Sequence, residues 1–125
     1  MLSLKSVEYS VGEFKLKADF KIPRLSKVAL IGPSGAGKST LLSLISGFLK
    51  PNSGSIIIDN EDVTTKLSNQ RRVTTIFQDG NLFPHLTVKK NISLGLRPDL
   101  RLNSAQQSVL DYAIDRVGLT DLVDR

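Results

Sequence analysis

The sequence contains no cysteine and no tryptophan, and its only histidine is His85. Without cysteine, disulfide bonds and thiolate metal sites are excluded. The aromatic residues are two Tyr and five Phe, and no block of basic residues is interleaved with them. This composition argues against a nucleic-acid partner. No apolar run approaches the roughly 18 residues of a membrane span, and the N-terminus lacks the apolar core of a signal peptide.

The residues that are present give an ordinary globular balance with a basic excess. Of 125 residues 40% are hydrophobic and 23% are charged, with a formal net charge of +5. This is enough for the core of one domain, or of part of a larger one. The basic residues are scattered, with Lys15, Lys17 and Lys21 alternating with apolar neighbours and Arg71-Arg72 and Lys89-Lys90 forming only pairs. The pattern favours solvated basic faces.

A phosphate-binding motif stands out between residues 32 and 40. The stretch consists of Gly32, Pro33, Ser34, Gly35, Ala36, Gly37, Lys38, Ser39 and Thr40. It matches Gly, four residues, Gly-Lys-Ser/Thr, in which backbone N–H groups cradle phosphate oxygens. The Lys38 ammonium can reach the β- and γ-phosphates, and the Ser39 hydroxyl can ligate Mg²⁺. A helix beginning here would add its positive N-terminal end.

The alternative interpretation of this motif is a glycine-rich turn that only connects a strand to a helix. The flanking residues argue against that alternative. The apolar run at residues 27–31 predicts a buried parallel strand leading into the loop. Beyond the loop, helical spacing relates Leu41, Leu42, Leu44, Ile45 and Phe48. Because Pro51 disfavours helical geometry at the residue before it, we expect the helix to end within residues 47–50. Strand, loop and helix in this order favour nucleotide binding.

Four further strands are predicted in the first 78 residues. Residues 2–9 and the alternating residues 14–22 flank a turn at Gly12, so they should pair antiparallel. Residues 55–59 and 71–77 are rich in β-branched side chains, and the second of these strands would deliver Gln78 at its end. Asp59 follows an apolar strand, as a Walker B carboxylate would. It lies too soon after the P-loop and Asn60-Glu61 continues a turn, so we interpret Asp59 as a turn residue.

The remaining residues predict helices. Thr87 is expected to cap a helix that closes at Gly95. Ser104 and Gln107 form the pattern of a capping box for a second helix, which would stop at Gly118. One face of that helix carries Ala105, Val109, Tyr112, Ala113 and Val117. A last short helix is expected from Thr120 or Asp121. The fold class is therefore α/β.

Two stretches together resemble the N-terminal half of an ATP-binding-cassette (ABC) ATPase. They are GPSGAGKSTLLSLISGFLKPNSGSI and IFQDGNLFPHLTVKKNI, and the run FQDGNLFPHLTVKKNISLGLRPDLRLNSAQQ is especially similar to the ATP-binding subunit of thiamine importers. The resemblance implies a P-loop NTPase fold, with a mixed sheet around the P-loop helix. It divides the chain into a nucleotide-binding core portion, residues 1–95, and the start of a helical subdomain, residues 96–125.

The resemblance also implies roles for single residues. Gly35, Gly37, Lys38, Ser39 and Thr40 would hold ATP and Mg²⁺. Gln78 would be the Q-loop glutamine, a catalytic residue that contacts Mg²⁺ and the water near the γ-phosphate; without the family context, a strand-end glutamine is usually solvated. The aromatic residue under adenine falls on Tyr9 when counted back from Lys38, and on the non-aromatic Val11 when aligned on the first strand.

The partners implied by the family are a membrane-spanning permease subunit and a second ATP-binding subunit in a homodimer. The chain would then lie at the cytoplasmic face of the inner or plasma membrane. Leu82, Phe83, Pro84 and Leu86 resemble the groove that receives a permease helix, although they could equally pack the loop onto its own domain. His85 is interpreted as a surface residue, since it lies too early to be the family's switch histidine.

The 125 residues contain no LSGGQ signature, no Walker B aspartate with a catalytic glutamate, and no switch histidine. Our first hypothesis is the ATP-binding subunit of an importer for thiamine or a similar small molecule, represented by a truncated chain. The alternative is a non-catalytic remnant that only binds nucleotide or docks a membrane partner, so enzyme activity stays open. A P-loop enzyme of another kind, such as a kinase, would not explain Gln78.

Overall fold

The computed structural model describes all residues from 1 to 125, which form two compact units, Met1–Thr75 and Ile76–Arg125. On the basis of the family resemblance, the chain was predicted to divide after residue 95. That division into a nucleotide-binding core and a helical subdomain stays a prediction.

The first unit contains a four-stranded sheet. Its strands are β1 (Leu2–Val11), β2 (Phe14–Ile22), β3 (Ser53–Ile58) and β4 (Glu61–Asp62), in the order β2-β1-β3-β4. All three pairings are antiparallel. The predicted hairpin around Gly12 is confirmed, and along β2 half-buried and exposed residues alternate from end to end. The alternation arises because successive side chains of a strand point to opposite faces.

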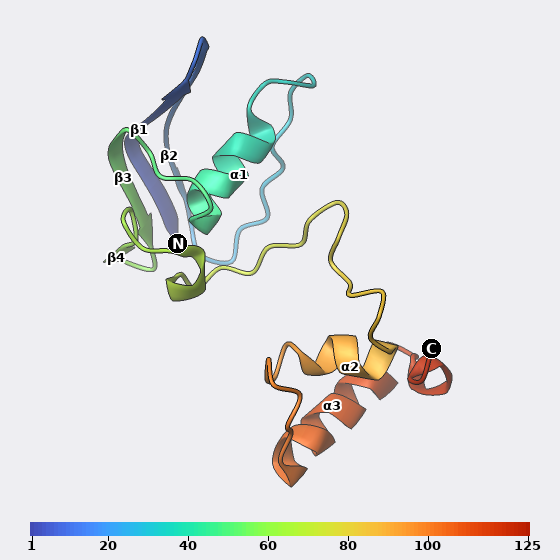
Figure 1. Cartoon of the computed structure of the whole chain (residues 1–125). Coiled ribbons are helices and arrows are strands. Elements are labelled where there is room, and N and C mark those ends of the chain that lie inside the picture. The colour runs from blue at the N-terminus through green and yellow to red at the C-terminus, as the bar shows by residue number, and fades with distance from the viewer. The chain divides into compact units, whose positions relative to one another are not determined.

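One face of the sheet is covered by helix α1 (Lys38–Ser46), as Figure 1 shows. The core between them consists of Leu4, Val7, Leu41, Leu44, Ile56 and Val63. Of the predicted apolar face of the helix, Leu41 and Leu44 are buried, whereas Leu42 is more than half exposed. The helix ends at Ser46 with Gly47 as its C-cap, at the start of the predicted range, and the Gly47 N–H donates to Leu44 O.

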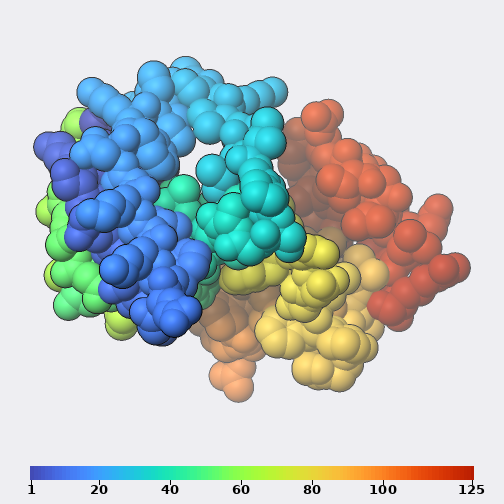
Figure 2. All heavy atoms as spheres, turned by 90° about the horizontal axis from the view of Figure 1, so that it is seen from above, coloured from blue at the N-terminus to red at the C-terminus, as the bar shows by residue number.

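The strand predicted at residues 27–31 does not form, and neither does the one at residues 71–77. Residues 27–31 and 72–76 make no backbone–backbone hydrogen bonds. Val28 is 63% and Ile31 90% exposed, and in Figure 2 the light-blue chain arches around an opening. These two predictions were wrong because β-branched composition cannot make a strand without a hydrogen-bonded neighbour, and no strand of this chain pairs with either segment.

The second unit contains α2 (Val88–Ser93), α3 (Ser104–Arg116) and the 3₁₀ turn η2 (Thr120–Leu122); the first unit has one further 3₁₀ turn, η1 (Ser68–Gln70). Thr87 caps α2 as predicted, accepting from the Lys90 N–H. The first turn of α2 is tied to the end of the chain, since the Lys89 N–H donates to Val123 O at 3.0 Å. The short terminal helix expected from Thr120 is confirmed as η2.

Two predictions about α3 were wrong. The capping box is formed by Asn103 and Gln106, one residue before the predicted pair of Ser104 and Gln107. The buried residues are Leu110 and Ile114, whereas the predicted face, residues 105, 109, 112, 113 and 117, is exposed. A helical face can be read from the sequence, but which face is buried depends on the packing partner. No helix of either unit is long and apolar enough to span a bilayer.

Candidate functional site

The predicted phosphate loop forms an open turn that leads into α1. Gly35 and Gly37 lie at φ 80° and 85°, and Lys38 is the first residue of the helix. Between residues 34 and 40 only the Ala36 N–H is engaged, donating to Pro33 O at 3.3 Å. The other N–H groups of this segment donate to no group of the protein. A row of unpaired N–H donors at a helix N-terminus is the arrangement that binds an anion.

The Lys38 ammonium lies across the same loop. Its Nζ donates to Gly32 O at 2.8 Å and to Pro33 O at 2.6 Å. Both acceptors are neutral carbonyl groups, so an anionic phosphate oxygen would make the stronger hydrogen bond with the ammonium. The sequence pattern placed Lys38 in the site, and the fold adds that its charged group points back over the loop.

A hollow of about 470 Å³ opens at this loop. It is lined by Ser34, Gly35, Gly37, Lys38, Ser39, Thr40 and Phe14. The first turn of α1 contains no acidic residue, so nothing there neutralises the positive end of the helix. The Ser39 hydroxyl makes no hydrogen bond within the protein, and an uncharged oxygen beside a phosphate cradle is a suitable ligand for Mg²⁺. The donors present therefore fit a magnesium-bound triphosphate.

Phe14 is the aromatic residue at this hollow, and our interpretation of the sequence did not include it. Tyr9 lies at a different, smaller hollow of about 230 Å³ with Lys15 and Asn52. Phe14 comes to the loop because it pairs across the hairpin with Val11, the position to which the first-strand alignment pointed. The sequence therefore pointed to the right place, Val11 on β1, but the aromatic residue there is Phe14 on the paired strand β2.

Gln78 and the predicted docking loop belong to the second unit. Gln78 is exposed, and Leu82 is 71% and Phe83 51% exposed. The loop is held by Asn91, whose Oδ1 accepts from the Phe83 N–H at 2.8 Å and whose Nδ2 donates to Leu86 O at 2.9 Å. The apolar side chains are thus presented on an anchored loop. The roles predicted for Gln78 and for this loop stay predictions.

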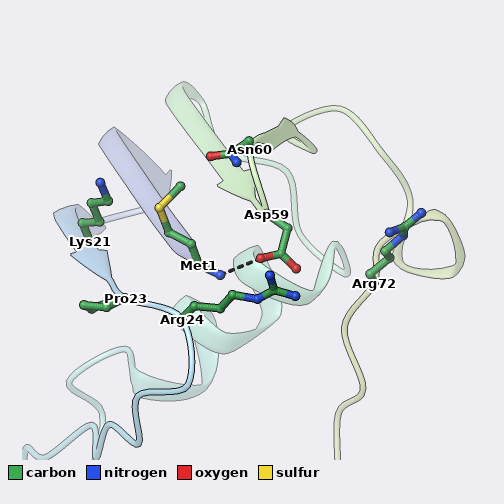
Figure 3. A pocket seen from close by; sticks show the side chains of 7 residues that line it. All are labelled: Met1, Lys21, Pro23, Arg24, Asp59, Asn60 and Arg72. Atoms are coloured by element: carbon green, nitrogen blue, oxygen red, sulfur yellow. Dashed lines mark hydrogen bonds and ion pairs between the residues drawn. The ribbon is translucent and has the colours of Figure 1, made fainter.

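Asp59 lies in the turn after β3, as predicted, at φ 47°. Figure 3 shows its carboxylate beside the Met1 ammonium, with Oδ1 at 2.7 Å from the nitrogen. This contact lowers the pKa of Asp59, and the charges of Arg24 and Arg72 add to the effect. The surrounding hollow, about 680 Å³, is lined by Met1, Lys21, Pro23, Arg24, Asp59, Asn60 and Arg72, and it includes no residue of the phosphate loop. Asp59 is therefore engaged away from that loop.

A model of one protein family, described as ABC transporter, matches residues 16–125. The chain belongs to the ABC transporter family. It is 46% identical over all 125 residues to the thiamine import ATP-binding proteins ThiQ of Yersinia pestis and Shigella flexneri. The alignments cover 53% and 54% of those two relatives, so this ABC chain spans about half the length of the curated relatives it matches.

Solved structures of ABC cassettes share the fold of this ABC chain. The dimeric, post-hydrolysis state of the ATP-binding cassette MJ0796 bound to ADP and Pi has a TM-score of 0.77 at 26% identity, covering all of this chain and 61% of that one. A nucleotide-free ATP-binding cassette from an ABC transporter has a TM-score of 0.78 at 25% identity, covering 99% and 56%. The predicted fold class, a P-loop ATPase cassette, is confirmed.

Proposed function

We propose that this chain supplies the phosphate-binding part of an ATP-binding subunit that energises the import of thiamine or a similar small molecule. The observation that carries the proposal is the row of unpaired N–H groups between residues 34 and 40, in the same loop whose Gly32 and Pro33 carbonyls accept from the Lys38 ammonium. The identity to thiamine import ATP-binding proteins supports the choice of transported molecule.

In this proposal the loop N–H groups bind the β- and γ-phosphates, and Lys38 turns from the Gly32 and Pro33 carbonyls to a phosphate oxygen. The Ser39 hydroxyl is a ligand for Mg²⁺, which supplies charge neutralisation of the phosphates when bound. The ring of Phe14 forms an apolar wall of the hollow. Tyr9 stays a second prediction for the contact with the base.

Gln78 is proposed as the residue that contacts Mg²⁺ and orients the attacking water, since its amide has both an oxygen acceptor and an N–H donor. Leu82 and Phe83 are proposed to receive a helix of a membrane-spanning permease subunit, and their exposure supports this. A second ATP-binding subunit and a peripheral place at the cytoplasmic membrane face complete the proposal.

Nucleotide binding is tested by titrating the chain with MgATP in a calorimeter. Lys38→Ala should weaken binding by about tenfold to a hundredfold, because it removes a charge-assisted hydrogen bond to phosphate. Lys50→Ala is the matched control, since Lys50 is an exposed lysine beyond the other end of α1. No MgATP binding by the unmutated chain, or equal effects of the two substitutions, would contradict the proposal.

A further inference from the structure

Arg71 and Arg72 are neighbours in the sequence, but their surroundings are opposite. We expected both to lie on solvated basic faces, and this is wrong for Arg71, which is 6% exposed. Its guanidinium makes four hydrogen bonds, all to backbone carbonyls. Arg72 is exposed, and its side chain makes no hydrogen bond and no ion pair within 4 Å. The two side chains therefore carry the same charge, but one is buried and the other is exposed to solvent.

Two of the four bonds of Arg71 go to the C-terminal end of the P-loop helix. Nη1 donates to Leu44 O at 2.7 Å and to Ile45 O at 2.9 Å. These carbonyls belong to the last turn of α1, where a helix has fewer N–H donors than C=O groups, and Leu44 O also accepts from the Gly47 N–H at 3.3 Å. A positive charge at this end also offsets the negative end of the helix dipole. Arg71 thus caps α1 from outside the helix.

The other two bonds go to the segment after β4. Nε donates to Lys66 O at 2.9 Å and Nη2 to Thr64 O at 3.3 Å. No carboxylate lies within 4 Å of Arg71, so carbonyl dipoles alone compensate its buried charge. Burial lowers the pKa of the guanidinium. Each of the three guanidinium nitrogens has at least one carbonyl acceptor, which offsets the cost of burying the charge.

Gly47 shows how closely the guanidinium packs against α1. A Cβ on Gly47 would lie 2.5 Å from Arg71 Nε and 2.9 Å from Cζ, and Gly47 has φ +81°. Both the space and the backbone conformation therefore require glycine at the end of the helix. This contact is a second observation that the Arg71 guanidinium packs directly against the end of α1.

We propose that Arg71 is a positioning residue for the phosphate site at the opposite end of α1. The inference rests on the proposed function, nucleotide binding at Lys38 and Ser39. Lys38 and Leu44 are six residues apart, about 9 Å along a helix, so a tilt at one end moves the other. Phosphate recognition depends on placement to within about half an ångström, and the residues that support a site set that precision.

The test compares MgATP affinity in Arg71→Gln, Arg71→Lys and Arg72→Gln with that of the unmutated full chain. Arg71→Gln and Arg72→Gln remove the same charge, so their difference cancels any general attraction for ATP. Titrations are run at a temperature at which circular dichroism shows each variant folded. Arg71→Gln should weaken binding by about tenfold and Arg72→Gln by less than about twofold. Arg71→Lys should fall between them, because an ammonium cannot reach all four carbonyls.

The results distinguish a positioning role of Arg71 from a purely structural role. A lower melting temperature for Arg71→Gln with unchanged MgATP affinity of the folded protein would mean a purely structural role and overturn the proposal, as would equal weakening in both Gln variants. Gly47→Ala displaces the same guanidinium, so it should weaken MgATP binding even if Arg71→Gln does not fold; unchanged affinity there would also count against it. If the unmutated chain binds no MgATP, the proposed function fails first and the inference fails with it.

Discussion

The ring of Phe14 occupies the space that a side chain on Gly37 would need. A Cβ on Gly37 would lie 2.9 Å from Phe14 Cζ and 3.1 Å from Leu16 Cδ1. Gly37 also has φ +85°, a conformation that costs other residues about 1–2 kcal/mol. The start of α1 and the strand β2 therefore meet at a point where only glycine fits.

We expect Gly37→Ala to lower the free energy of unfolding by about 2–4 kcal/mol, the sum of left-handed strain and overpacking. Gly35→Ala is the control, because Gly35 has a similar φ of +80° but no atom within 4 Å of its Cβ position. It should lower stability by only about 1–2 kcal/mol. Urea denaturation of both variants measures the difference. Equal losses of stability would mean that the Phe14 contact does not add to the destabilisation by Gly37→Ala.

Acid should weaken the junction of β3 and β4 through Asp62. Asp62 Oδ1 accepts from the Thr64 hydroxyl at 2.5 Å and from the Thr64 N–H at 2.9 Å. These hydrogen bonds lower the pKa of Asp62 from its usual 3.8. A carboxyl with a lowered pKa stabilises the fold above its unfolded-state value, and this contribution is lost as the pH falls below about 4.

The measurement is the urea midpoint of the unmutated chain and of Asp62→Asn at pH 7 and pH 3. The Asn side chain keeps an oxygen acceptor for Thr64 but does not titrate in this range. The urea midpoint of the unmutated chain should therefore fall further between pH 7 and pH 3 than the midpoint of Asp62→Asn. Identical losses would show that Asp62 does not contribute to the acid dependence.

The N-terminus of α3 distinguishes two neighbouring capping residues. Asn103 Oδ1 accepts from the Gln106 N–H at 2.9 Å, and Gln106 Oε1 accepts from the Asn103 N–H at 3.1 Å. Asn103→Ala should lower stability by about 1 kcal/mol, the usual effect of losing an N-cap. Ser104→Ala should change it by less than about 0.5 kcal/mol, since alanine is a good first helical residue. Thermal unfolding followed by circular dichroism compares them, and the reverse order would restore Ser104 as the cap.

Local patterns in the sequence were sufficient for the elements whose hydrogen bonds stay close along the chain. The alternation at residues 14–22 predicted β2, and Gly12 predicted the hairpin turn. Gly47 and Pro51 predicted the end of α1, and Thr87 predicted the start of α2. The phosphate loop was readable for the same reason, since its donors, its ammonium and its helix all lie within residues 32–46. What the sequence by itself determined is therefore local: the hairpin, the loop, the end of α1, the start of α2 and the family, whereas the cap of α3 lies one residue before the predicted one.

The tertiary structure decided everything that depends on a distant neighbour. Residues 27–31 have strand composition but no strand to bond with, and the buried face of α3 is set by what packs on it. Phe14 rather than Tyr9 lines the phosphate loop because the hairpin register brings it there. Arg71 is buried beside α1 while Arg72 is solvated, although both are arginines in one dipeptide. Pairing, burial and charge compensation are relations between residues far apart in the chain, and only the folded chain establishes them.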